Sequence, residues 1–162
     1  MAKRIITKIG DIFCVEVDND YKCYFQYVAN DMTVLNSSVI RVFEKHYPMD
    51  YVPVFDDIVK DNVYFYAHTI LRFGILYNAW YKVGKHSNLG NPSEITFRMY
   101  NDVGNPHRTK SYHWVKWKIN QKQEFIGEMR EEYVNYDLGI VFSYLDIVSK
   151  IKTGNYLLRH VD

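Results

Sequence analysis

Alternation of apolar and polar residues with a period of two is the feature that most constrains the fold of this chain. Between residues 9 and 17 the apolar side chains fall on alternate positions, at Ile9, Phe13, Val15 and Val17. A strand places every second residue on one face, whereas a helix does not. Residues 18–20 (Asp-Asn-Asp) are turn formers, and an aromatic run follows over residues 21–29. This segment is therefore predicted to form a β-hairpin.

Strand composition recurs along the rest of the chain. It is found at residues 37–43, 63–71, 95–100, 112–120, 123–127 and 139–142. Two segments favour helices instead: residues 54–59, and residues 144–151, which are followed by Lys152 and Gly154 as at many helix ends. We therefore expect a mainly β (α+β) fold, a strongly curled antiparallel sheet or partly open barrel of about six to eight strands with one or two short covering helices.

The composition is that of a folded domain with an excess of aromatic side chains. The chain has 162 residues, of which 48% are hydrophobic and 17% aromatic. That length suits one domain, and no repeat or Pro/Ser-rich linker divides it, so a single domain over residues 1–162 is expected. Aromatic side chains favour strands and dominate the energetics of both cores and contact surfaces.

Net charge and hydropathy exclude some classes of partner. The formal net charge is +1, which gives no whole-molecule attraction for a polyanion or an anionic membrane. No apolar run approaches the roughly 20 residues that span a bilayer, and no export signal follows the basic start, so a cytoplasmic protein is expected. Cys14 and Cys23 could form a cross-strand disulfide if they shared a face, but two reduced, half-buried thiols are the preferred interpretation.

The common catalytic signatures are absent from the sequence. There is no phosphate-binding glycine loop, no His-Glu-x-x-His, no Gly-x-Ser-x-Gly and no Cys-x-x-Cys motif. The six histidines lack the spacing that would let two of them bind one metal from a single element. We therefore expect no catalytic residue, no metal and no cofactor. His68 is the histidine of most interest, although a structural role is the favoured interpretation for a lone histidine in a strand.

A basic strand is the most informative local feature. Residues 103–123 contain no acidic residue but five lysines and arginines, Arg108, Lys110, Lys116, Lys118 and Lys122. Alternation predicts that one face of this strand points outward and binds a partner through Tyr112, Trp114, Lys116 and Lys118. A solvated face packed against its neighbours is the alternative. The acidic residues that follow, from Glu124 to Asp137, could neutralise the lysines, which disfavours nucleic acid as the partner.

Several short motifs resemble one family of bacterial proteins. They are Ile-Gly-Asp-Ile-Phe at residues 9–13, Tyr-Phe-Gln-Tyr at 24–27, Asp31, Leu-Asn-Ser at 35–37, Val-Ile-Arg-Val-Phe at 39–43, Phe-Tyr-Ala-His-Thr at 65–69, Trp80, Lys-Val-Gly at 82–84 and Phe-Arg at 97–98. Together they resemble immunity-protein family twenty-six of the polymorphic-toxin systems. The resemblance implies a mostly β fold and a cytoplasmic inhibitor that binds a cognate toxin. It implies no catalytic residues.

Three functional hypotheses follow. The first is an immunity-type protein that neutralises its cognate toxin by stoichiometric binding. The second is a small hydrolase-like enzyme with a candidate pocket around His68, formed by Gln26, Asp31, Arg41, Tyr66, His68 and Arg98. The third is a single-stranded nucleic-acid binder that uses residues 112–118. An exposed aromatic strand edge could also pair two copies into a homodimer.

Overall fold

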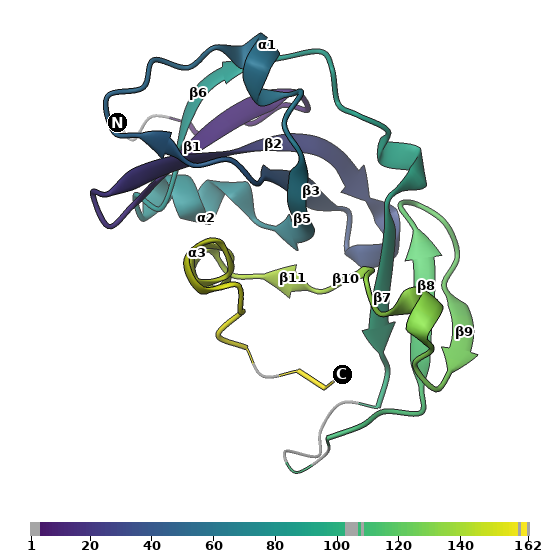
Figure 1. The fold of residues 1–162 in the computed structure, drawn as a ribbon. Coiled ribbons are helices and arrows are strands. Elements are labelled where there is room, and N and C mark those ends of the chain that lie inside the picture. Colours follow the sequence, from purple (N-terminus) through teal and green to yellow (C-terminus); the bar gives the residue numbers. More distant parts are fainter. Residues whose placement is uncertain (1–3, 103–106, 108, 159, 162) are drawn as a thin grey trace.

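The computed structural model describes residues 4–102, 107, 109–158 and 160–161, and its strands are divided between two sheets (Figure 1). The seven-stranded sheet contains β1 (Asp11–Val17), β2 (Tyr21–Asp31), β3 (Ser37–Phe43), β4 (Tyr47–Pro48), β5 (Val63–Thr69), β6 (Tyr81–Lys85) and β11 (Val141–Phe142). The four-stranded sheet contains β7 (Thr96–Tyr100), β8 (Trp114–Lys118), β9 (Glu124–Gly127) and β10 (Asp137–Leu138). The predicted mainly β class is confirmed, whereas neither sheet of the described residues is closed or strongly curled.

Strand order places distant parts of the chain side by side. The seven-stranded sheet runs β11-β5-β3-β2-β1-β6, with β4 added beside β2, and the four-stranded sheet runs β10-β7-β8-β9. β11 and β10 pair in parallel with β5 and β7, while the other pairs are antiparallel. The segment from β10 to β11 therefore joins the edges of both sheets (Figure 1).

The predicted hairpin is formed by β1 and β2. Its turn residues Asp18 and Asn19 have φ values of 52° and 55°, and the left-handed conformation at both positions matches the twist of a tight hairpin. Asp and Asn tolerate this conformation better than most residues, which explains why this turn can close here.

The hairpin register separates the two cysteines. Cys14 lies opposite Tyr24, whereas Cys23 lies opposite Val15. The two sulfurs therefore belong to opposite faces of the sheet, Cys14 with Ile12 and Cys23 with Phe25. Both cysteines are free and buried, so the cross-strand disulfide is not formed. Burial raises the pKa of the Cys23 thiol to about 12, which leaves it protonated and unreactive at neutral pH.

Both faces of the seven-stranded sheet are covered. On one face Phe13, Phe25 and Phe65 pack against Trp80 and Ile147. The opposite face carries a smaller cluster that includes Ile12, Tyr24, Phe43 and Ile58. A third cluster lies between the sheets and joins Val28 and Val39 to residues of the four-stranded sheet, Ile95, Phe97, Val115, Trp117 and Ile119. Such two-sided burial explains why apolar residues occur on both faces of several strands.

Three short α-helices cover these surfaces. α1 (Phe55–Ile58) and α3 (Tyr144–Thr153) confirm the two predicted helices. α3 begins at Ser143, whose hydroxyl accepts the backbone N–H of Asp146, and ends at Gly154 with φ 82°. α2 (Leu71–Leu76) was not predicted, because its first residue had been assigned to the strand at 63–71. β5 ends at Thr69 instead.

Candidate functional site

Asp31 and His68, two residues of the candidate pocket, meet in a buried hydrogen-bond network that joins the two sheets. The Nε2 atom of His68 lies 2.9 Å from Oδ2 of Asp31, and the indole N–H of Trp117 donates to the same oxygen at 3.0 Å. The other carboxylate oxygen accepts the backbone N–H groups of Thr33 and Asn120, at 3.0 and 2.9 Å. Sequence reasoning missed Trp117, because a tryptophan in a strand gives no signal of which group its N–H will meet.

These bonds determine the charge state of Asp31. Burial alone would raise the pKa of Asp31, but the hydrogen bonds from His68, Trp117 and Asn120 outweigh it and lower the pKa to about 2. Asp31 is therefore ionised at neutral pH, and His68 must donate through Nε2. The Nδ1 atom of His68 is buried and without a hydrogen-bond partner among the described residues.

The Asp31–His68 pair is sealed from solvent. Both side chains are 0% exposed, and the ring of Phe97 lies 4.2 Å from the imidazole. A general base must reach the proton that it removes, either directly or through one water. The carboxylate and imidazole have the geometry of such a pair, but in this conformation no substrate can contact them.

Gln26 and Arg41 form a second, separate group. The guanidinium of Arg41 donates through Nε to Oε1 of Gln26 at 2.9 Å and through Nη2 to the backbone oxygen of Asn88 at 2.7 Å. Gln26 in turn donates to the backbone oxygens of Gly10 and His86. Burial lowers the pKa of Arg41. The two side chains therefore hold the loop after β6 against the sheet.

Tyr66 and Arg98 belong to neither of these hydrogen-bonded groups, although Tyr66 lies opposite Arg41 in the pairing of β3 with β5. Tyr66 lines a polar pocket beside Asp137, whereas Arg98 is buried, donates through Nε to the backbone oxygen of Tyr136 at 2.8 Å, and lies over the ring of Trp114. The six residues of the candidate pocket are thus divided among separate sites. The prediction that they converge in one accessible cleft is wrong, because most of them point into the interior.

The basic strand differs from its prediction at one residue. Trp114 is 0% exposed, packed in the cluster that includes Ile126 and Leu138, so its expected outward position is wrong. Alternation was interpreted correctly, since Val115 and Trp117 belong to the other face, but that second face is covered as well. Tyr112, two residues before β8, is exposed.

The lysines of this strand are paired with carboxylates. Nζ of Lys116 lies 2.9 Å from Glu124, and Nζ of Lys118 lies 2.8 Å from Glu94. Lys110 pairs with Glu128. The acidic segment that follows the strand therefore neutralises much of the patch, as expected. Arg108 of the predicted patch lies outside the described residues.

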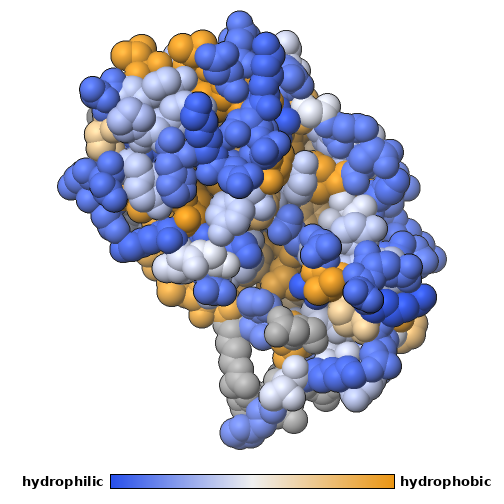
Figure 2. Space-filling view, viewed as in Figure 1, coloured by the Kyte–Doolittle hydropathy of each residue, from blue (hydrophilic) through white to orange (hydrophobic). Residues whose placement is uncertain are grey.

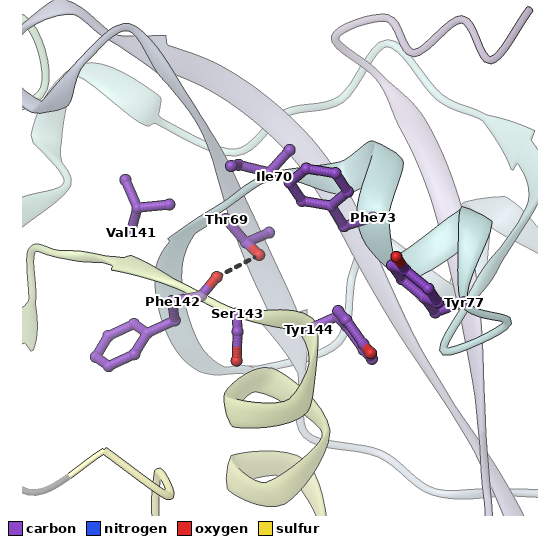
Figure 3. A pocket seen from close by; sticks show the side chains of 8 residues that line it. All are labelled: Thr69, Ile70, Phe73, Tyr77, Val141, Phe142, Ser143 and Tyr144. Atoms are coloured by element: carbon purple, nitrogen blue, oxygen red, sulfur yellow. Dashed lines mark hydrogen bonds between the residues drawn. The ribbon is translucent and has the colours of Figure 1, made fainter.

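An apolar groove lies between α2 and the start of α3 (Figure 3). It encloses about 450 Å³ and is lined by Thr69, Ile70, Phe73, Tyr77, Val141, Phe142, Ser143 and Tyr144. Ile70, Phe73 and Tyr77 are exposed on the α2 side, and Tyr77 stacks on Tyr144 at 5.3 Å. The hydroxyl of Thr69 donates to the backbone oxygen of Phe142 and fixes the floor (Figure 3).

Sequence reasoning did not find this groove. The spacing of Ile70, Phe73 and Tyr77 is that of one helical face, and it was the available signal. It was overlooked because the preceding strand has the same apolar composition. Elsewhere, on the side of the molecule shown in Figure 2, the surface is largely hydrophilic and hydrophobic residues emerge in separate clusters.

Comparison with known proteins gives no match: no protein-family model, no curated protein and no solved structure matches this chain. Within the described ranges, no three His, Cys, Asp or Glu side chains are grouped so that they could hold a metal ion. The helices found there are also too short or too polar to cross a membrane. The resemblance to immunity-protein family twenty-six stays a prediction.

Proposed function

We propose that this chain is a cytoplasmic immunity-type protein that neutralises a cognate bacterial toxin by stoichiometric binding. The observation that carries the proposal is the groove between α2 and α3, where Phe73, Tyr77 and Tyr144 surround an open apolar hollow. Aromatic anchors of this kind supply much of the energy of protein–protein recognition, because they bury a large area and lose little conformational freedom.

The apolar lining of the groove also suits a protein partner. Exposed apolar side chains gathered at one place, rather than scattered singly, are characteristic of contact surfaces. Leu76 and Leu145 are exposed in the helices that form the groove and extend its apolar margin. The resemblance to immunity proteins supplies the class of partner, a toxin, and the groove supplies a surface on which it could be held.

The two alternative functions have less support. An enzyme centred on His68 would need a substrate to reach an imidazole that is 0% exposed. A single-stranded nucleic-acid binder would need Trp114 as a stacking platform and unpaired lysines beside it. Trp114 is buried, and Lys116 and Lys118 are neutralised by glutamates.

Co-expression with the toxin domain encoded by the adjacent gene tests the proposal. The wild-type chain should protect the host cell and co-purify with that domain in a one-to-one ratio. Phe73→Asp places a charge in the groove, and we expect it to weaken binding at least a hundredfold and to abolish protection. Val52→Asp, at an exposed apolar residue outside the groove, is the control and should protect fully.

Two results would contradict the proposal. Absence of both protection and co-purification with the wild-type chain would remove the immunity function. Full protection by Phe73→Asp, with the variant folded, would show that the groove is not the binding surface.

A further inference from the structure

A polar pocket lies where η2 (Pro92–Glu94), β5 and β10 meet. It encloses about 300 Å³ and is lined by Tyr66, Asn91, Glu94, Ile95, Thr96, Asn135, Tyr136 and Asp137. It shares no lining residue with the apolar groove. Its lining combines two carboxylates, two tyrosines and two side-chain amides, so it differs in chemistry from the groove.

Asp137 is the residue that distinguishes this pocket. Its Oδ2 atom accepts the backbone N–H of Tyr66 at 2.9 Å, and in the part of the chain that the structure describes no cation lies within 4 Å of the carboxylate. Burial raises its pKa to about 6, against the opposing effects of the Tyr66 N–H, Lys150 and Arg98. A half-buried carboxylate without an ion-pair partner costs folding stability when ionised, and such groups are enriched at functional sites.

The cations around the pocket are engaged elsewhere. Lys150 of α3 lies with Nζ 5.0 Å from the ring centre of Tyr156. Arg98 of β7 contacts Tyr136 and Trp114, as described above. Lys118 is paired with Glu94, and Arg41, the cross-strand neighbour of Tyr66, donates to Gln26 and Asn88. None of these side chains forms an ion pair with Asp137.

We propose that this pocket binds a guanidinium or ammonium group, with Asp137 as its counter-ion and Tyr66 and Tyr136 as aromatic walls. Tyrosine rings attract cations, and the side-chain oxygens of Asn91 and Asn135 can accept hydrogen bonds from such a group. The cation can belong to a small free molecule or to an arginine or lysine of a bound protein. This inference does not depend on toxin binding, because the two sites have separate linings.

The test is an NMR titration of the isotope-labelled full-length chain. The probes are N-acetylarginine methylamide, which mimics a protein side chain, and butylammonium, which mimics a small free ligand. N-acetylglutamate methylamide is the control probe. At pH 7.5 we expect saturable shifts of the backbone amides of Tyr66, Thr96 and Asp137 with at least one basic probe and none with the acidic one. Binding of only butylammonium would identify a site for an ammonium group, and binding of the capped arginine would identify a site for a guanidinium group.

Two further measurements test whether binding depends on the Asp137 carboxylate. Asp137→Asn keeps an oxygen for the Tyr66 N–H and should bind at least tenfold more weakly, whereas Asp50→Asn, at an exposed residue outside the pocket, should bind normally. The wild-type chain should also bind about tenfold more weakly at pH 5, where Asp137 is mostly protonated. Absence of saturable shifts with both basic probes would overturn the proposal. It would also be overturned if Asp137→Asn, and the wild-type chain at pH 5, bound the probe as tightly as the wild-type chain does at pH 7.5.

Discussion

At the scale of single residues, Asp31 has the largest structural role of the polar residues considered. Its two oxygens accept four hydrogen bonds, from β5, β8, the turn after β8 and its own 3-10 turn η1 (Met32–Val34). The sequence indicated that Asp31 and His68 were notable but could not show that they are buried together. That information depends on the contact between two sheets, which no local pattern contains.

Asp31→Asn should destabilise the fold strongly. The amide retains one acceptor but places an NH₂ group against N–H donors, and we expect a loss of about 3–5 kcal/mol in the free energy of unfolding. Urea denaturation monitored by tryptophan fluorescence measures this loss. Asp50→Asn, at an exposed aspartate, should change stability by less than about 0.5 kcal/mol. A loss below about 1 kcal/mol for Asp31→Asn would show that the network contributes little.

The lowered pKa of Asp31 predicts that the free energy of unfolding decreases at low pH. Its pKa is lowered in the folded chain from 3.8 to about 2, so its contribution is complete above about pH 4 and is lost as the pH falls towards 2. A shift of roughly two pKa units corresponds to about 2–3 kcal/mol. The stability difference between wild type and Asp31→Asn should therefore narrow in this range, and a constant difference down to pH 2 would contradict the assignment.

At the scale of elements, α2 shows how a short helix is determined by what it packs against. Gly74 of α2 packs against the indole of Trp80. A Cβ atom at residue 74 would lie 1.9 Å from Cε2 of Trp80. The indole N–H donates to the backbone oxygen of Leu71 in the first turn of the same helix. A glycine in a helix of only six residues that follows directly after a strand gives little helix signal, which explains why α2 was missed.

Gly74→Ala should therefore destabilise the chain, although alanine is the better helix former. Displacing Trp80 from its packed position costs about 1–3 kcal/mol, and the helix preference of alanine recovers at most about 1 kcal/mol. Thermal unfolding should show a lower midpoint for Gly74→Ala and almost no change for Arg72→Ala, at an exposed position of the same helix. An unchanged or raised midpoint for Gly74→Ala would show that Trp80 moves aside at no cost.

The elements that could be predicted are those with a local signal. The hairpin of β1 and β2, the third strand β3 and the helix α3 follow from alternation, turn residues and the helix end marked by Lys152 and Gly154. The burial of Trp114 could not be predicted. Alternation shows on which face of the strand a residue lies, but it does not show what packs against that face. Ile126 and Leu138, which cover it, come from β9 and β10.

At the scale of the whole molecule, the two sheets are held together by apolar packing and by the polar network of Asp31. Phe97 and Trp117 belong to the cluster between the sheets, and Trp117 also donates to Asp31. The segment from Asp137 to Tyr144 then passes along the edge of β5 and contributes to both hollows, the polar pocket at one end and the apolar groove at the other. Contacts between the sheets therefore also position the two candidate binding surfaces.

Hydrogen exchange of the chain with and without its cognate toxin domain tests the central claim most directly. Binding in the groove should slow backbone exchange in α2 and at residues 141–144, which line the groove, and leave the basic strand β8 unchanged. Slowed exchange confined to β8 and Tyr112, or no slowing at either place in a verified complex, would contradict the groove as the binding surface.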